Sequence, residues 1–171
     1  VETTLLRCCT LRMLAFMESP MRVWKLARYL LLLLLAPPAL GSTLLVVGDS
    51  ISAGFGLDAQ PGWVELLDQR LQQQGIDYKV VNASISGDTS AGGLARLPAL
   101  LAEYRPSLVI LELGGNDGLR GQPPEQLQQN LAAMIQQSQK AGAKVLLLGM
   151  QLPPNYGARY TKAFAKVYQD V

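Results

Sequence analysis

The sequence predicts an α/β fold in which a parallel β-sheet lies between two layers of helices. Four short segments are almost entirely apolar and have the length of buried strands: residues 44–47, 78–81, 108–113 and 144–148. Segments with apolar residues at helical spacing separate them. Strands that are apolar on both faces and alternate with helices are typical of a three-layer α/β/α arrangement with a parallel sheet. With right-handed crossovers, this alternation favours a flavodoxin-like strand order of 2-1-3-4.

The length and composition indicate one globular domain, because the chain has 171 residues, of which 49% are hydrophobic and 16% charged. The net charge of +2 arises in residues 1–41, which carry five Lys or Arg and two acidic residues. Residues 42–171 carry ten Lys or Arg and eleven acidic residues, so we expect no nucleic-acid partner. Both cysteines, Cys8 and Cys9, lie in the front segment, and we therefore expect no disulfide framework in the domain.

The front segment divides into two parts. Residues 1–20 begin with Val and show no clean periodicity, so we interpret them as an extension of the gene start, the alternative being a long leader. Residues 21–41 have a basic region, a leucine-rich run from Tyr29 to Ala36, and small residues where a signal peptidase reads. The run is less than half of the roughly 20 residues that a membrane span needs. We predict a cleaved signal peptide, with an uncleaved anchor as the alternative, and a domain over residues 42–171 that is periplasmic or secreted and has no stable membrane span.

Turn residues and helical spacing place the first two long helices. A glycine-rich loop over residues 53–57 follows the first strand, and Gly75 ends the helix that comes next. The apolar face of this helix consists of Trp63, Leu66, Leu67 and Leu71. After the second strand, a helix is predicted over residues 90–104, and Arg105-Pro106 ends it.

The second half of the domain repeats the alternation. The third strand is apolar except for Glu112, and the longest helix begins at Pro123-Pro124-Glu125. The buried stripe of this helix consists of Leu127, Leu131, Met134 and Ile135. Gly142 precedes the fourth strand, and a loop over residues 151–157 leads to a last helix from Ala158. Because the sequence stops on this helix, we expect a fifth strand and a final helix in a longer chain.

Small or polar residues follow each of the first three strands: Ser50, Gly87 and Asn116. The carboxyl ends of parallel strands meet at one edge of a sheet, so we expect these residues to lie close together. A serine hydroxyl becomes an acyl nucleophile when a base removes its proton. The backbone N–H groups of Ser50 and Gly87 and the amide of Asn116 can donate to a developing oxyanion. Each residue alone is ordinary at a helix N-cap or a turn, but together they predict an acyl-transfer site.

Three motifs carry a resemblance to a known family: Gly48-Asp49-Ser50-Ile51-Ser52, residues 82–87, and Gly114-Gly115-Asn116-Asp117. In this order they resemble the SGNH (GDSL-type) hydrolases, above all the periplasmic branch of multifunctional esterases, thioesterases, lysophospholipases and arylesterases. The resemblance covers residues 43–171. It implies that Ser50 is the acylated nucleophile and that Ser50, Gly87 and Asn116 form the oxyanion hole. The substrates it implies are carboxylic esters and thioesters, namely aryl esters, acyl-CoA and lysophospholipids, with no cofactor.

Two further segments, residues 118–121 and 151–160, look like the substrate-side loops of that branch. Their apolar side chains Leu119, Leu152 and Tyr156 are candidates for an acyl groove, and ordinary loop packing is the alternative. We expect no metal site, because histidine is absent, the cysteines lie in the front segment and no calcium-loop pattern occurs. We also expect a monomer.

The catalytic Asp and His of the family's site are missing from these residues, and the His is the base. In the family it is a histidine in an Asp-x-x-His motif near the carboxyl terminus, and the 171 residues contain no histidine. We expect the motif in a continuation of the chain and little turnover without it, because removing the histidine of a serine triad can cost about 10⁶ in kcat. Glu112 and Asp117 are conceivable replacement bases. Glu112 is expected instead to satisfy strand-end backbone or an arginine such as Arg96.

A different class of function remains open at this point. The alternative is a non-catalytic exported α/β module that binds a small acyl or glycosyl ligand. Flavin or nucleotide binding is disfavoured, because the first strand is not followed by a Gly-x-Gly-x-x-Gly pattern or by a glycine-rich loop with Lys-Ser/Thr.

Overall fold

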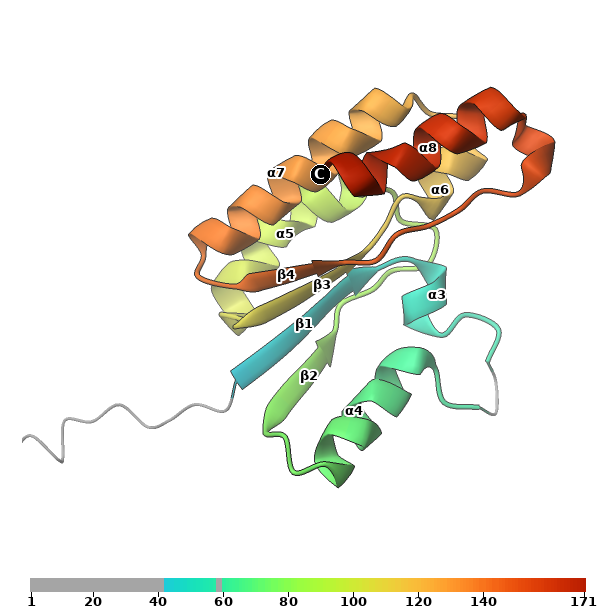
Figure 1. Ribbon diagram of the computed structural model, residues 1–171. Helices are drawn as coiled ribbons and strands as arrows, with labels where there is room; N and C mark the ends of the chain where they lie inside the picture. Colours follow the sequence, from blue (N-terminus) through green and yellow to red (C-terminus); the bar gives the residue numbers. More distant parts are fainter. Residues whose placement is uncertain (1–41, 58–59) are drawn as a thin grey trace, which may run out of the picture. The chain divides into compact units, whose positions relative to one another are not determined.

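The computed structural model describes residues 42–57 and 60–171 (Figure 1). The predicted gene-start extension at 1–20 and the predicted signal peptide at 21–41 lie outside the described residues. Within the described residues, no helix is both long enough and apolar enough to cross a membrane.

The sheet has the predicted architecture. Its strands are β1 (Ser42–Gly48), β2 (Tyr78–Asn82), β3 (Leu108–Glu112) and β4 (Lys144–Leu147). All neighbouring strands are parallel, and their order is β2-β1-β3-β4, as predicted. The pairing of β1 with β3 places Gly48 beside Glu112 at the carboxyl edge. The first three strands therefore end side by side, and β4 is the edge strand next to β3 in the described part of the chain.

The long helices form the two outer layers (Figure 1). They are α4 (Trp63–Gln73), α5 (Ser90–Tyr104), α7 (Pro124–Lys140) and α8 (Ala158–Asp170). In β1, Leu45 and Val47 pack in the core cluster that also contains residues of α5, α7 and α8. The alternate residues Leu44 and Val46 pack with α4 on the opposite face. Because β1 is buried on both faces, it reads in the sequence as a continuous apolar run.

Three short elements occur where the sequence predicts only loops or turns: α3 (Ser50–Ala53), α6 (Gly115–Leu119) and the 3₁₀-helix η1 (Pro154–Tyr156). They are too short to show a helical period in the sequence. α3 and α6 follow β1 and β3 directly, so the residues expected in the site lie on short helices.

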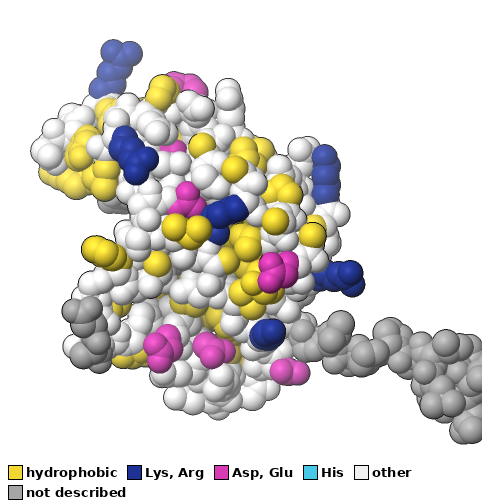
Figure 2. All heavy atoms as spheres, turned by 180° about the vertical axis from the view of Figure 1, so that it is seen from behind, with side chains coloured by type: hydrophobic (Ala, Val, Ile, Leu, Met, Phe, Trp, Pro, Cys, Tyr) yellow, Lys and Arg dark blue, Asp and Glu magenta, His cyan; other side chains and the backbone are white. Residues whose placement is uncertain are grey.

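Charged side chains lie on the surface without a strong bias of sign. On the face shown in Figure 2, Lys and Arg side chains are interspersed with Asp and Glu side chains. Most buried side chains in the described residues are apolar, and the buried polar or charged ones are Asp49, Ser52, Ser90, Glu112, Asp117 and Ser138. Most of these buried polar groups lie at the carboxyl edge of the sheet or next to it, where the candidate site residues also lie.

Candidate active site

Ser50 is the first residue of α3 and follows the carboxyl end of β1. The chain turns at Asp49, whose carboxylate accepts a hydrogen bond from the Ile51 N–H at 3.0 Å and caps the short helix. Asp49 is buried, whereas Ser50 is partly exposed. The turn therefore presents the Ser50 side chain at the sheet edge and directs the Asp49 side chain inward.

Gly87 lies in the exposed loop between β2 and α5. Its φ of +80° is a left-handed conformation that favours glycine. A Cβ built at this position would meet nothing within 4 Å, so the space beside its backbone is open. This position allows a ligand to approach the Gly87 backbone without hindrance from a side chain.

Asn116 connects the other two positions. Its side-chain Nδ2 donates to the backbone carbonyl of Asp88 at 2.9 Å and to Asp49 Oδ2 at 3.2 Å. Asp49 directly precedes Ser50, and Asp88 directly follows Gly87. The structure thus brings the loops that carry Ser50, Gly87 and Asn116 together at one edge of the sheet.

The hydrogen bonds of Asn116 also set a condition on its use. A carboxamide nitrogen carries two hydrogens, and both have protein acceptors here. To bind an oxyanion, the Asn116 amide must therefore release one of these two acceptors and donate that hydrogen to the oxyanion. The bond to Asp49 Oδ2 is the longer of the two at 3.2 Å, so it is the one expected to exchange.

A buried carboxylate lies beneath α3. Glu112 Oε2 accepts a hydrogen bond from Ser52 Oγ at 2.5 Å, and Ser52 Oγ accepts one from Trp63 Nε1 at 3.2 Å. Gly48 makes this arrangement possible, because a Cβ there would lie 2.6 Å from Ser52 Oγ and 2.8 Å from Glu112 Oε2. The glycine of the Gly-Asp-Ser motif is therefore required by close packing. The sequence shows Ser52 only as part of a motif and predicts no contact for it.

Of the two partners expected for Glu112, strand-end backbone or an arginine such as Arg96, the structure excludes Arg96. Arg96 Nε donates to Asp88 Oδ2 at 2.8 Å instead. Glu112 neighbours Gly48 in the sheet, and its carboxylate occupies the space that Gly48 leaves free. Its bond to Ser52 follows from the register of β1 and β3, which the spacing of residues in the sequence does not reveal.

Burial raises the pKa of Glu112 above its ordinary value of 4.5, and the negative charge of Asp49 raises it further. Burial also raises the pKa of Asp49. In addition, Glu112 Oε1 is buried and has no hydrogen-bond partner within the described structure. Both carboxyl groups therefore favour the protonated form more than an exposed carboxyl group does.

The raised pKa of Glu112 predicts a pH-dependent effect of Glu112→Gln on stability. The folded state binds the Glu112 proton more tightly than the unfolded state does. Protonated Glu112 therefore contributes to the stability of the fold below pH 4.5, and this contribution is lost as the pH rises through the raised pKa. Glutamine cannot ionise, so the unfolding free energy of the variant should improve relative to wild type as the pH rises from 4.5 to 8. Urea unfolding at several pH values measures this. Exposed Glu125→Gln is the control, and a constant difference between Glu112→Gln and wild type over this range contradicts the prediction.

Asp117 connects α6 to two neighbouring helices. Its Oδ2 accepts from the Ser90 N–H at 2.8 Å and its Oδ1 accepts from Ser90 Oγ at 2.5 Å. Asn130 Nδ2 in turn donates to Ser90 Oγ at 2.8 Å. Asp117 is 1% exposed, and both of its oxygens bind α5, so its contacts are those of a residue that fixes the loop of Asn116.

The three acyl-groove candidates are neighbours at one side of this edge. The Tyr156 hydroxyl donates to the Leu119 carbonyl at 3.3 Å. Leu152 packs against Gly118, where an added Cβ would lie 2.5 Å from Leu152 Cδ2. Leu119 is 52% exposed, whereas Leu152 is partly buried against the core. Leu119 is therefore available for a ligand, and Leu152 serves in part as ordinary packing.

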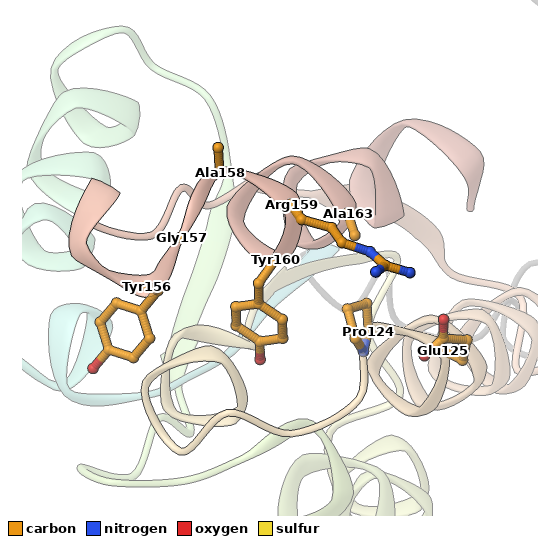
Figure 3. A pocket seen from close by; sticks show the side chains of 8 residues that line it. All are labelled: Pro124, Glu125, Tyr156, Gly157, Ala158, Arg159, Tyr160 and Ala163. Atoms are coloured by element: carbon orange, nitrogen blue, oxygen red, sulfur yellow. The ribbon is translucent and has the colours of Figure 1, made fainter.

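A cavity of about 470 Å³ lies where α7 and α8 begin (Figure 3). Its lining residues are Pro124, Glu125, Tyr156, Gly157, Ala158, Arg159, Tyr160 and Ala163. Of the residues predicted for the site, the lining includes only Tyr156. Figure 3 shows Tyr160 pointing toward the loop before α7, where its hydroxyl donates to the Gln122 carbonyl at 2.6 Å. This cavity is separate from the convergence of Ser50, Gly87 and Asn116.

No group of three or more His, Cys, Asp or Glu residues in the described part of the chain is arranged to hold a metal ion.

Residues 46–171 match the GDSL-like Lipase/Acylhydrolase family. The chain belongs to this family. Esterase TesA of Pseudomonas aeruginosa is 68% identical over 151 residues, which are 88% of this chain and 75% of the relative. Thioesterase 1/protease 1/lysophospholipase L1 of Escherichia coli is 49% identical over 145 residues, 85% of this chain and 68% of the relative. An arylesterase of Vibrio mimicus is 49% identical over 125 residues, 73% of this chain and 62% of the relative.

Solved structures of this GDSL-like family show the same fold. The crystal structure of TesA superposes with a TM-score of 0.74 at 71% identity, covering 75% of this chain and 72% of the other. A structure of the psychrotrophic esterase EstA from Pseudoalteromonas sp., inhibited by monoethylphosphonate, gives a TM-score of 0.72 at 46% identity, covering 75% and 70%. The protein is thus an SGNH-type hydrolase of ester bonds, in the branch of the esterases, thioesterases and lysophospholipases.

Proposed function

We propose that the protein hydrolyses carboxylic esters and thioesters through an acyl intermediate on Ser50. The observation that carries this proposal is the pair of hydrogen bonds from Asn116 Nδ2 to Asp49 and Asp88, which connects the loops of the nucleophile and of the donors. The names of the relatives, an esterase, a thioesterase and lysophospholipase, and an arylesterase, support aryl esters, acyl-CoA and lysophospholipids as substrate classes.

In the proposed reaction, Ser50 Oγ attacks the acyl carbonyl carbon while a base takes the hydroxyl proton. The carbonyl oxygen becomes an oxyanion that accepts hydrogen bonds from the N–H groups of Ser50 and Gly87 and from Asn116 Nδ2. Collapse of this intermediate expels the alcohol or thiol, which receives the proton from the base. Water then attacks the acyl-Ser50 carbonyl by the same steps and releases the carboxylic acid.

The proposed base is a histidine outside these 171 residues, which contain none. The two buried carboxyl groups considered as replacement bases are poorly placed for this role, because Glu112 bonds Ser52 and Asp117 bonds Ser90. A serine hydroxyl without a base is a weak nucleophile. The activity experiments below therefore use the complete gene product, which means these residues together with any others that the gene encodes.

We further propose that the acyl chain lies along Leu119, Leu152 and Tyr156, which the Tyr156–Leu119 bond and the packing of Leu152 on Gly118 hold side by side. The protein would be exported by the leader at residues 21–41 and act as a monomer. The leucine-rich run and the small residues that follow it support export.

Covalent labelling tests the nucleophile. A fluorophosphonate probe should add one equivalent to the complete gene product, and peptide mass spectrometry should place it on Ser50. Ser50→Ala should take up no label, and Ser86→Ala, which removes an exposed serine from the Gly87 loop, should label as wild type does. The intact mass also reports the amino terminus, expected at Ser42. Label on another residue, or none on a folded protein, contradicts the proposal, and the absence of label favours the acyl- or glycosyl-binding module.

A further inference from the structure

We propose that Arg96 is a positioning residue that holds the oxyanion-hole loops in register by joining three of their segments through one guanidinium group. This inference rests on the proposed function, because it assigns Arg96 a role in that same site. It concerns the placement of the donors, and Arg96 itself is not assigned a contact with substrate.

The guanidinium of Arg96 extends from α5 to three separate segments. Nε donates to Asp88 Oδ2 at 2.8 Å, Nη1 donates to the Ala83 carbonyl, and Nη2 donates to the Gly48 carbonyl at 3.4 Å. Gly48 ends β1 just before the nucleophile turn, Ala83 directly follows β2, and Asp88 directly follows Gly87. The side chains of Arg96 and Asp88 are 20% and 12% exposed, so the pair is mostly shielded from solvent.

Asp88 passes this restraint on to Asn116. Its carboxylate binds Arg96, and its backbone carbonyl accepts the hydrogen bond from Asn116 Nδ2 at 2.9 Å. The Ile85 N–H also donates to the Gly48 carbonyl at 3.0 Å, so the loop after β2 is joined directly to the end of β1. The Arg96–Asp88 ion pair therefore connects the segments that carry all three proposed donors.

The Gly87 turn has few other restraints. Gly87 is exposed, and its carbonyl accepts from Arg120 Nη2 at 3.1 Å in an exposed contact. The contact through Asp88 is better shielded and joins two opposite charges, whereas Arg120 donates to a neutral carbonyl. Displacement of a reacting group by about 1 Å can cost about 10²-fold in rate. Loss of the Arg96 contacts should therefore act on the chemical step.

Arginine is required here for its shape as well as its charge. A planar guanidinium offers several N–H donors in fixed directions, whereas a lysine ammonium is a compact charge on a flexible stem. Lysine can keep the ion pair with Asp88, but it cannot hold the Gly48 and Ala83 carbonyls in the same plane. A purely electrostatic or stabilising role would be retained by lysine, and a positioning role would not.

Variants of Arg96 in the complete gene product test this. Arg96→Lys and Arg96→Ala should lower kcat for a p-nitrophenyl ester by about 10- to 100-fold, with KM changed by less than about threefold. Exposed Arg70→Lys on α4 is the matched control and should behave as wild type. Methylguanidinium in solution should restore part of the activity of Arg96→Ala, whereas methylammonium should not. If Arg96→Ala does not fold, the isosteric Asp88→Asn replaces it and should show the same selective loss of kcat.

The rate of phosphonate labelling separates this inference from the proposed function. If wild type labels at Ser50 and the Arg96 variants label about 10-fold more slowly or worse, the positioning role is supported. If wild type and variants label at Ser50 at the same rate, or if kcat falls only in proportion to the folded fraction, the positioning role is wrong and the proposed function stands. If wild type does not label at Ser50, the proposed function itself fails.

Discussion

Ser50→Ala in the complete gene product is expected to lower kcat for a p-nitrophenyl ester by about 10⁶-fold, the loss seen when the serine of a hydrolytic triad is removed. The variant lacks the atom that forms the acyl intermediate, so only the binding of substrate and the oxyanion donors remain. These leave a residual rate about 10³- to 10⁴-fold above that in water. The initial rate at saturating substrate, with active-site titration of the wild type, measures the effect.

The control for Ser50→Ala is a test that the variant keeps the wild-type fold. Asp49 caps α3 through its carboxylate and the Ile51 N–H, so the short helix does not depend on the Ser50 hydroxyl. The variant should therefore melt within a few degrees of wild type and still bind a non-hydrolysable acyl analogue. Retention of more than about 1% of kcat, after purification free of host esterases, would mean that another group forms the intermediate.

The sheet was predictable because burial leaves a strong trace in the sequence. β1 and β3 are covered by helices on both faces, so nearly every residue in them is apolar. The long helices α5 and α7 have a buried stripe at regular spacing and a proline or glycine near one end; α5 has the predicted bounds, and α7 begins where it was predicted to begin. The strand order followed from the handedness of the crossovers, which is independent of side-chain contacts.

The local geometry of the site was less predictable. α3 is a short helix capped by Asp49, and α6 is a short helix that begins after Gly114 without a side-chain cap; neither leaves a periodic pattern. The Ser52–Glu112 bond depends on the register of β1 and β3 and on the missing side chain of Gly48. This bond is determined by atoms that are close in space and distant in sequence.

The polar contacts at the sheet edge show the same limit. Asn82 Nδ2 donates to the Ser52 carbonyl at 2.8 Å and so ties the turn after β2 to α3. The Ser84 side chain makes no such contact, because Ser84 Oγ is buried without a hydrogen-bond partner in the described structure. Arg96 was one of the partners expected for Glu112, whereas in the structure it pairs with Asp88.

Asn116→Ala is expected to lower kcat by about 10²- to 10³-fold, the usual cost of removing one oxyanion-hole donor. KM should change little, because the Asn116 amide bonds Asp49 and Asp88 in the free protein and turns to the oxygen only as negative charge develops. Asn116→Asp should lose at least as much. It replaces the donor by a carboxylate next to the buried Asp49, which repels the oxyanion as well.

A thionoester distinguishes this role from a general effect on structure. Sulfur accepts hydrogen bonds weakly, so a hole built for oxygen should favour an ester over the matching thionoester in the wild type. Asn116→Ala should reduce this preference, since one of the donors that discriminate the two atoms is gone. Ser86→Ala serves as the control on the same edge and should keep the wild-type ratio. If Asn116→Ala loses activity equally on both substrates, Asn116 acts by holding the Asp49 and Asp88 loops together, and the oxyanion hole consists of backbone N–H groups alone.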